Sequence, residues 1–352
     1  MEKLSGLEKR LKRWCEISSW SHDPAGLKVM QEALSVDFAP LDADQERLGC
    51  GLIFRKRPSA PLQIYLGGHY DTYHQTGWPV REEGGRLYGP GVADMKGGLV
   101  ILLEALTRLE AQGGERVGWR VVLNGDEELG SPKSRPVIEE VAKGCHLALL
   151  FEPALPDGAL INERKGSANY RIGVKGRAAH AGRDPEAGRS ATHALIALFA
   201  DLPAGWNVGK IEGGEALNGV AESASALLNI RYEAPFDLAG RIAHIEKSRE
   251  VAITCETLSD RPPKPISAGT EQLMGIIERL DPEVRWQKTG GVCDGNLVAA
   301  QGVPCLDTLG VVGGGLHTAE EYCVRQSLVE RSRLAGDLLC GLNIGEIEWE
   351  SV

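Results

Sequence analysis

Histidine and carboxylate side chains recur along this chain where apolar or glycine-rich segments end. Seven of them stand out, in this order: His69, Asp71, Asp94, Glu127, Glu128, Glu152 and His317. Imidazole and carboxylate groups are zinc ligands in proteins. Two histidines and three carboxylates would suffice for two divalent cations, with one glutamate left to act as a base. The set therefore predicts a metal-dependent hydrolase.

The spacing of His69 and Asp71 suits a histidine that is held in place by its neighbour. In an extended chain residues i and i+2 point the same way, so Asp71 can accept a hydrogen bond from one ring nitrogen of His69. That bond would fix the tautomer and leave the other nitrogen for a metal ion. Taken alone, a His-x-Asp sequence also fits an ordinary turn histidine.

Asp94 and the pair Glu127–Glu128 each have a structural alternative. Asp94 lies in the glycine-rich stretch 91–98 and could bridge two cations, although aspartate is also common in turns. Adjacent carboxylates after an apolar strand can divide two roles, with one on the metal while the other faces a bound water. The alternative for this pair is stabilisation of a helix N-terminus.

Glu152 and His317 complete the set. Glu152 directly follows the apolar run 147–151, where a carboxylate without a partner is costly. It also fits an exposed glutamate just beyond a strand. His317 follows three glycines and also fits a flexible-loop histidine. Each residue alone is a weak indication, but five potential ligands in this order along one α/β domain favour a shared site.

Apolar periodicity predicts alternating helices and strands around these residues. Helices are expected at 3–19, 25–35, directly after Asp94, 132–143, 268–280 and 325–341. Strands are expected at 51–54, 62–66, 118–123, 146–151 and 303–309, and a charged loop at 82–91. Because the strands are apolar rather than alternating, we expect an α/β fold: a mostly parallel mixed sheet with helices on both faces. The candidate residues follow strand ends, where such sheets place active sites.

The pattern changes over about 167–262. Strands in which apolar and polar residues alternate are expected around Tyr170 and Leu228, and helices at 189–202 and 236–249. This indicates a small α+β insertion. The expected division is a catalytic domain made of 1–166 and 263–352, interrupted by an α+β domain of 167–262.

Size and composition restrict the function classes. A chain of 352 residues with a net charge of −10 is long enough for two domains and shows no basic patch of the kind that binds nucleic acid. No apolar run reaches the ~18 residues of a membrane-spanning helix, and the N-terminus lacks the apolar segment of a secretory signal. The eight cysteines form no C-x-x-C pair and are expected to be free. These features predict a cytoplasmic protein with neither nucleic acid nor membrane as a partner.

With these motifs the chain resembles the two-zinc aminoacylase/carboxypeptidase family, which includes glutamate carboxypeptidase, acetylornithine deacetylase and succinyl-diaminopimelate desuccinylase. The resemblance covers essentially the whole chain and implies a zinc exopeptidase-like fold with two Zn²⁺ ions, or Co²⁺ or Mn²⁺ in their place. It implies His69 and Glu152 at one zinc, Glu128 and His317 at the other, and Asp94 as the bridge. A cis peptide bond after Asp94 is also implied.

The resemblance also implies catalytic and substrate-binding residues. Glu127 would be the general base, and Asp71 would orient His69. The glutamate carboxypeptidase branch is the most similar, and the insertion resembles the lid or dimerisation domain of that family, which implies a homodimer. His180, in Gly-Arg-Ala-Ala-His-Ala-Gly, resembles the lid histidine that reaches the substrate, commonly across the dimer.

Three further residues resemble that branch's binders of the substrate carboxylate or carbonyl: Asn218, Arg231 and Arg261. Arg231 and Arg261 also fit a solvated strand face and a turn. The chain departs from the family at Ala221, where proline is usual, and at Val292–Cys293, where Gly-Thr or similar is common. The second departure is near the expected substrate pocket and leaves a strict preference for glutamate open.

The implied reaction is hydrolysis of an amide bond next to a free carboxylate, in small peptides or N-acyl amino acids, by a water between the metals with a glutamate base. An N-deacylase of the acetylornithine deacetylase or desuccinylase type is the alternative. An inactive metal- or ligand-binding homologue is the alternative of another class. The sequence contains neither Gly-x-Ser-x-Gly nor His-Glu-x-x-His, which argues against serine catalysis and a thermolysin-like site.

Overall fold

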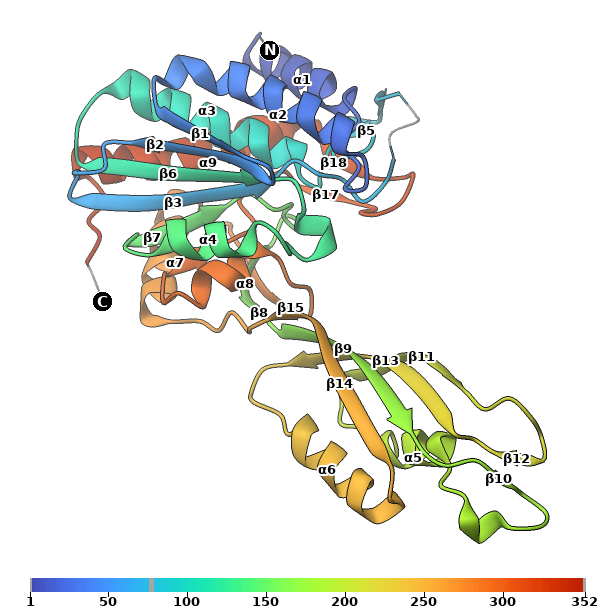
Figure 1. Ribbon diagram of the computed structural model, residues 1–352. Coiled ribbons are helices and arrows are strands. Elements are labelled where there is room, and N and C mark those ends of the chain that lie inside the picture. The colour runs from blue at the N-terminus through green and yellow to red at the C-terminus, as the bar shows by residue number, and fades with distance from the viewer. Residues whose placement is uncertain (1, 76–78, 351–352) are drawn as a thin grey trace. The chain divides into compact units, whose positions relative to one another are not determined.

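The computed structural model describes residues 2–75 and 79–350, and these form two compact units (Figure 1). The first unit comprises Met1–Arg164, Lys264–Thr289 and Cys293–Val352. The second comprises Lys165–Pro263 and Gly290–Val292. The segment Gly290–Val292 thus groups with the second unit, although the expected boundaries assign it to the catalytic domain.

A six-stranded mixed sheet forms the centre of the first unit, in the order β1-β2-β6-β3-β7-β16. Its strands are β1 (Asp44–Leu48), β2 (Gly51–Lys56), β3 (Leu62–His69), β6 (Val117–Asn124), β7 (Leu147–Leu150) and β16 (Cys305–Leu306). The last four run parallel to one another, whereas β1 and β2 pair antiparallel. The carboxyl ends of the parallel strands therefore meet at one edge, and the prediction of a mostly parallel sheet is confirmed.

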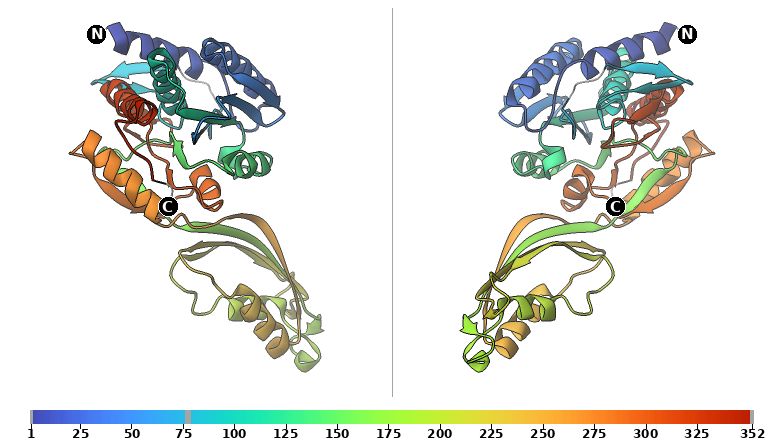
Figure 2. Two further views of the ribbon diagram at one scale, coloured as in Figure 1. Left: turned by 90° about the vertical axis from the view of Figure 1, so that its left-hand side faces the viewer. Right: turned by 90° about the vertical axis from the view of Figure 1, so that its right-hand side faces the viewer.

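Helices cover both faces of this sheet because the strand side chains alternate between two apolar clusters (Figure 2). Ile64 and Leu66 of β3 belong to a large cluster with α1, α3 and α9, whereas Tyr65 belongs to a smaller one with α4 and α8. The helices are α1 (Glu2–Cys15), α2 (Pro24–Phe38), α3 (Lys96–Gln112), α4 (Arg135–Ala142), α7 (Ala268–Leu280), α8 (Asp294–Ala299) and α9 (Arg325–Ile344). In Figure 1, α1–α3 are drawn above strand β3 and α4 is drawn below it.

The first helix ends four residues earlier than the expected range 3–19. Residues beyond Cys15 are used elsewhere: Ser19 and Ser21 exchange backbone hydrogen bonds with Thr72 at 2.9 and 3.2 Å. The buried Lys96 Nζ donates to the carbonyl oxygens of Trp14 and Ile17 at 3.1 and 3.0 Å. These contacts satisfy carbonyl groups at the helix end that have no partner within the helix.

The charge and glycines of 82–91 predict a loop, but the range is only partly a loop. It contains a hairpin of β4 (Arg81–Glu83) and β5 (Arg86–Tyr88), and β5 pairs with β18 (Tyr322–Val324), which in turn pairs with β17 (Gly313–Gly314). A partner more than 200 residues away in sequence gives the short strands their hydrogen bonds. Conversely, the strand expected at 303–309 forms regular pairs only over β16.

Gly98 allows α3 to approach the end of β7. A Cβ atom at this position would lie 1.8 Å from the carbonyl oxygen of Phe151. Because Phe151 immediately precedes Glu152, this contact fixes the start of α3 against the residue before a candidate ligand.

A buried ion cluster anchors the points where the chain leaves and re-enters the first unit. Arg164, at the end of β8 (Leu160–Arg164), and Lys264 exchange two backbone hydrogen bonds of 3.0 Å. The Asp307 carboxylate accepts Nε and Nη2 of Arg164 at 2.8 and 3.0 Å and lies 3.3 Å from Lys264 Nζ. The strand β8 also pairs in parallel with β15 (Trp286–Thr289).

The second unit is a four-stranded antiparallel sheet, in the order β11-β13-β9-β14, with two helices packed on it. Its elements are β9 (Gly166–Lys175), β10 (Ala179–His180), α5 (Ala191–Leu198), β11 (Trp206–Gly213), β12 (Gly219–Val220), β13 (Ser223–Tyr232), α6 (Leu238–Arg249) and β14 (Ala252–Arg261). Apolar side chains of β9 and β13 alternate into one cluster with α5 and α6, as the sequence pattern predicts.

Three short 3₁₀ helices complete the secondary structure of the described residues: η1 (Ala39–Leu41), η2 (Glu127–Leu129) and η3 (Pro185–Ala187). Over 2–75 and 79–350, no helix has both the length and the apolar character that a membrane crossing requires.

Candidate metal centre

Five side chains converge beyond the carboxyl ends of the parallel strands in the first unit, and we call them the ligand set: His69, Asp94, Glu128, Glu152 and His317. His69 ends β3, Glu152 follows β7, and Glu128 lies in η2 after β6. Asp94 lies just before α3 and His317 between β17 and β18. The peptide bond between Asp94 and Met95 is cis.

The ligand set forms two clusters that share Asp94. In the inner cluster, His69 Nε2 lies 3.1 Å from Asp94 Oδ1 and 3.7 Å from Glu152 Oε2. In the outer cluster, His317 Nε2 lies 3.5 Å from Asp94 Oδ2 and 3.2 Å from Glu128 Oε2. The two oxygens of one carboxylate thus face two separate groups of potential ligands, each within 4.8 Å of one another.

Histidines are the basic groups that pair with the carboxylates of the two clusters. Among residues 2–75 and 79–350, no lysine or arginine forms an ion pair with Asp94, Glu128 or Glu152. Oε1 of Glu128 is buried and has no hydrogen-bond partner in the described part of the chain. A buried carboxylate oxygen without a partner is costly, so this donor set fits bound divalent cations.

The pKa values within the ligand set reflect burial and mutual contact. Burial raises the pKa of Glu152 to about 8, and it also raises the pKa of Glu128. Hydrogen bonds to Asp94 and Glu128 raise the pKa of His317 to about 10. Burial opposes protonation of His69, but Glu152 and the bonds to Asp71 and Asp94 outweigh it and raise its pKa. The set thus holds protons that bound cations would displace.

Asp94 has the opposite behaviour within this set. Burial alone would raise its pKa, but hydrogen bonds from His317 and His69 outweigh burial and lower it. The shared carboxylate therefore stays ionised at neutral pH.

Asp71 joins His69 to the segment that carries the two adjacent glutamates. His69 Nδ1 lies 3.0 Å from the carbonyl oxygen and 3.3 Å from Oδ1 of Asp71. The fully buried Asp71 carboxylate also accepts the backbone N–H groups of Glu127 and Glu128, both at 3.2 Å, and the hydroxyl of Ser21 at 2.8 Å. The spacing of His69 and Asp71 predicts the first contact, and nothing in the sequence indicates the others.

Glu127 lies one residue before Glu128 in η2, and its side chain is mostly buried. Its charge contributes to the raised pKa values of both Glu128 and Glu152. A carboxylate whose charge acts on groups of both clusters, and which belongs to neither, is suitably placed to accept a proton.

Sequence reasoning missed three residues around the ligand set. Glu321 is buried and accepts three backbone N–H groups of the loop that carries Asp94. Lys96 is fully buried and holds the end of α1. His74 contacts the His317 carbonyl through Nε2. The position of Lys96 inside an otherwise apolar and glycine-rich stretch could have indicated a structural role, whereas nothing in the sequence singles out Glu321 or His74.

His180 and Asn218 lie side by side in the second unit. Both side chains are exposed, and β10 pairs with β12 so that His180 opposes Gly219. The Asn218 carbonyl accepts the Ala181 N–H at 2.9 Å, and His180 Nδ1 accepts the Gly182 N–H at 3.1 Å. The short two-stranded pairing thus brings together two residues that are 38 positions apart in sequence.

Arg231 and Arg261 also lie in the second unit, on β13 and at the end of β14. Arg231 is half-buried and donates to Gly290 O at 3.0 Å and to Asn229 Oδ1 at 3.2 Å. Arg261 is 6% exposed, so it does not belong to a solvated turn. All four candidate substrate residues are therefore in the second unit, whereas the ligand set is in the first.

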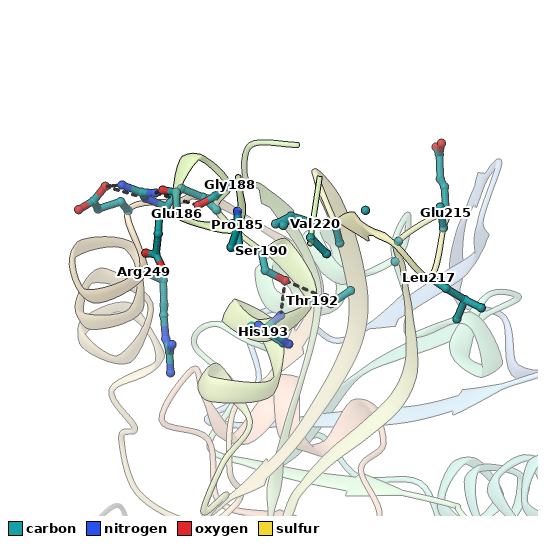
Figure 3. Close-up of a pocket in the computed structure, with 18 of the residues that line it drawn as sticks. Pro185, Glu186, Gly188, Ser190, Thr192, His193, Glu215, Leu217, Val220 and Arg249 are labelled. Atoms are coloured by element: carbon teal, nitrogen blue, oxygen red, sulfur yellow. Dashed lines mark hydrogen bonds and ion pairs between the residues drawn. The ribbon is translucent and has the colours of Figure 1, made fainter. Parts of the chain in front are cut away.

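A hollow of about 1100 Å³ occurs within the second unit beside the start of α5 (Figure 3). Ser190, Thr192 and His193 lie on one side of it, with Glu215 and Leu217 on the other. Arg189 at its edge is paired with Glu250, and Ser190 Oγ accepts the His193 N–H at 3.2 Å. Within the described residues no histidine–carboxylate cluster lies here, so the hollow is not the centre of the chemistry.

Comparison with known proteins shows the family to which the chain belongs. Residues 65–340 match the model of a family described as Peptidase family M20/M25/M40. Carboxypeptidase G2 of Pseudomonas sp. (strain RS-16) is 28% identical over 96% of this chain and 89% of its own length. Succinyl-diaminopimelate desuccinylase of Azoarcus sp. (strain BH72) is 26% identical over 91% of this chain and 94% of its own.

Solved structures share the fold. Aminopeptidase PepT of Bacillus cereus aligns with a TM-score of 0.79 at 19% identity, over 96% of this chain and 98% of that one. The YXEP protein of Bacillus subtilis, described as a dinuclear metal-binding peptidase of family M20, aligns with a TM-score of 0.74 at 13% identity, over 97% and 98%. Since the family match spans most of the chain, the protein belongs to peptidase family M20/M25/M40 and is a metal-dependent hydrolase.

Proposed function

We propose that the chain hydrolyses an amide bond next to a free carboxylate, in small peptides or N-acyl amino acids, with two zinc ions. The observation that supports this most is the shared position of Asp94, whose two carboxylate oxygens face the inner and the outer cluster. Two cations held by one carboxylate would be close enough to act on the same bond.

The donor set supports zinc, with Co²⁺ or Mn²⁺ as alternatives. Each cluster supplies one imidazole and two carboxylates, and three protein ligands leave a coordination position open, as in catalytic zinc sites. The chemistry that two bound zinc ions would supply is polarisation of the amide carbonyl and a lower pKa for the attacking water.

Glu127 is proposed as the general base. It would take a proton from the attacking water and return it to the leaving nitrogen, which needs a carboxylate close to both clusters but in neither. Its influence on the pKa values of Glu128 and Glu152 supports that location. Asp71 would hold the His69 ring so that Nε2 faces the inner cluster.

The candidate residues of the second unit would bind the substrate. His180 would stabilise the developing oxyanion, because a donor at that position acts most strongly as charge builds up. The guanidinium groups of Arg231 and Arg261, with Asn218, would hold the free carboxylate or carbonyl of the substrate.

The second candidate function is removal of an acyl group from an N-acyl amino acid, which the similarity to desuccinylases favours. An assay of the zinc-loaded protein with dipeptides and with N-acetyl and N-succinyl amino acids separates the two candidate functions by their kcat/KM values. Hydrolysis of no amide in this panel by zinc-loaded protein would contradict both and favour an inactive binding homologue.

The matching variant in this assay is Glu127→Ala. We expect kcat to fall by several orders of magnitude, on the order of 10³ or more, while the variant still binds two zinc ions, because Glu127 belongs to neither cluster. Metal content measured by mass spectrometry checks retention. Wild-type kcat in Glu127→Ala would remove this residue from the proposed role.

Two further features belong to the same proposal. A homodimer through the second unit is supported by the exposed edge strand β11, where Ile211 is 52% exposed, since open sheet edges readily pair with a second chain. Light scattering on the purified protein tests it. The cytoplasm is supported by eight cysteines that are all free, as is usual in a reducing compartment.

A further inference from the structure

The carboxylate of Glu321 lies beneath the loop that carries Asp94. Its Oε2 accepts the N–H of Gly91 at 3.0 Å, and its Oε1 accepts the N–H groups of Ala93 and Asp94 at 2.9 and 3.0 Å. The residue is 5% exposed. One side chain thus accepts three of the four backbone N–H groups of residues 91–94, which are more than 220 positions away in sequence.

The hydrogen-bond partners of the Glu321 carboxylate are backbone N–H groups. Over 2–75 and 79–350, no lysine, arginine or histidine nitrogen forms an ion pair with it. Burial of a carboxylate without a cation is costly unless several donors bind it. Three convergent N–H groups form such an arrangement, and it exists only while the loop keeps this conformation.

Glu321 also belongs to the segment that carries His317. The Glu321 N–H donates to Thr318 O at 3.2 Å, and the Thr318 hydroxyl donates to Gly315 O at 2.7 Å. Gly315 has a φ of 66°, and a Cβ atom there would lie 2.4 Å from Glu320 O, so only glycine fits this turn. The turn from 315 to 321 is therefore a defined unit with His317 inside it and Glu321 at its end.

These contacts join two loops at the outer cluster. The turn that ends at Glu321 places His317 Nε2 at 3.5 Å from Asp94 Oδ2, and the Glu321 carboxylate holds the backbone of Asp94 itself. Glu321 touches none of the ligand atoms. It acts on them through the backbone of both loops.

We propose that Glu321 is a positioning residue: its carboxylate fixes the Asp94 loop against the His317 turn, so that the outer cluster keeps its geometry before a metal ion binds. This inference rests on the proposed two-zinc function. Residues that orient metal ligands without touching the metal typically contribute about 10- to 100-fold to metal affinity. Loss of Glu321 should therefore weaken one zinc site more than the other.

The test is equilibrium binding of Zn²⁺ alone to the metal-stripped full chain in chelator-buffered solutions, with metal content read by mass spectrometry. We expect wild type to bind two zinc ions per chain. Glu321→Ala should bind the second ion about 10- to 100-fold more weakly. Glu321→Gln keeps the side-chain volume but has one acceptor oxygen fewer, so we expect a smaller loss at the same site.

The matched control is Glu320→Ala. Glu320 is adjacent in sequence, its side chain is 71% exposed, and its carboxylate pairs with Arg81 at 2.7 Å on the surface. This variant should bind both zinc ions with wild-type affinity. If Glu321→Ala does not fold, as judged by circular dichroism, the Glu321→Gln variant decides the question.

Failure of the positioning role and failure of the proposed two-zinc function would give different results. If folded Glu321→Gln and Glu321→Ala bind two zinc ions as tightly as wild type, even with a lower melting temperature, Glu321 only stabilises the fold and the inference is overturned. If wild type itself does not bind two zinc ions, the proposed function fails first. A selective loss of the second ion with Glu320→Ala unaffected supports the positioning role.

Discussion

At the scale of single residues, Asp71 links the His69 ring to the segment that carries Glu127 and Glu128. Its carboxylate lies beside the His69 ring and accepts the backbone N–H groups of Glu127 and Glu128. One buried side chain therefore sets the orientation of an inner-cluster histidine and the position of the proposed base. Asp71 can make these contacts because its carboxylate has two equivalent acceptor oxygens.

Replacement of Asp71 by asparagine removes one of those acceptors. An amide nitrogen would then face either the N–H of Glu127 or the N–H of Glu128, and the His69 ring would lose its charged neighbour. We expect kcat/KM to fall by about 10- to 100-fold in zinc-loaded protein, with a weaker inner zinc site. Steady-state kinetics and zinc titration measure both effects.

The matched control is Asp23→Asn. The Asp23 carboxylate caps α2 by accepting the N–H groups of Ala25 and Gly26, and asparagine is an equally good N-cap. Its activity should equal that of wild type. Equal kinetics in Asp71→Asn and Asp23→Asn would contradict the orienting role of Asp71.

At the scale of elements, the positions of the candidate ligands depend on how closely α3 packs against the sheet. The helix begins directly after Asp94, and Gly98 in its first turns lies against the carbonyl of Phe151, one residue before Glu152. This single contact fixes the helix start relative to the end of β7. The glycines after Asp94 thus have a packing reason, in addition to any closeness to a metal.

Gly98→Ala should separate these two elements. The added methyl group would lie 1.8 Å from backbone that cannot rotate away, so we expect a loss of at least about 1–3 kcal/mol in the free energy of unfolding. Urea denaturation measures it through the midpoint at constant slope. Zinc affinity should fall with it, because Glu152 follows the displaced residue.

Gly275→Ala in α7 is the control for replacing a helical glycine by alanine where no backbone contact is created. A Cβ atom there meets only the Arg279 guanidinium at 3.9 Å, so helix propensity dominates and stability should rise by about 0.5–1 kcal/mol. A Gly98→Ala variant as stable as Gly275→Ala would show that the α3–β7 contact is not required.

At the scale of the whole molecule, the ligand set makes the stability of the metal-free protein depend on pH. Glu152 has a folded pKa of about 8 against an ordinary 4.5, so between these values the folded chain holds a proton that the unfolded chain has lost. His317, with a folded pKa of about 10 against 6.5, acts in the same direction above pH 6.5. The folded state therefore binds more protons across this range.

The free energy of unfolding of metal-free protein should accordingly fall as pH rises from 5 to 8. Bound zinc displaces those protons, so the zinc-loaded protein should lose this dependence and melt at a higher temperature. Calorimetry with chelator and with zinc, at matched pH values, measures both trends. A metal-free protein whose stability rises from pH 5 to 8 would contradict the assigned protonation.

Local sequence by itself determined the residue types of the site, the parallel character of the central sheet and the antiparallel character of the second unit. Apolar runs such as 147–151 and alternating segments such as 223–232 report burial on two faces or on one, and that information is contained within a few residues. The same local pattern shows that His69, Asp94, Glu152 and the other candidates follow apolar or glycine-rich segments.

Only the tertiary structure decided which of these groups meet and what holds them. The order of the strands brings His317 to Asp94, pairs β5 with β18 and places Glu321 under a loop from the other end of the chain. Such contacts join segments more than 200 residues apart, so no local periodicity encodes them. They follow from the packing of the completed sheet and its helices, and this packing fixes the geometry of the candidate metal centre.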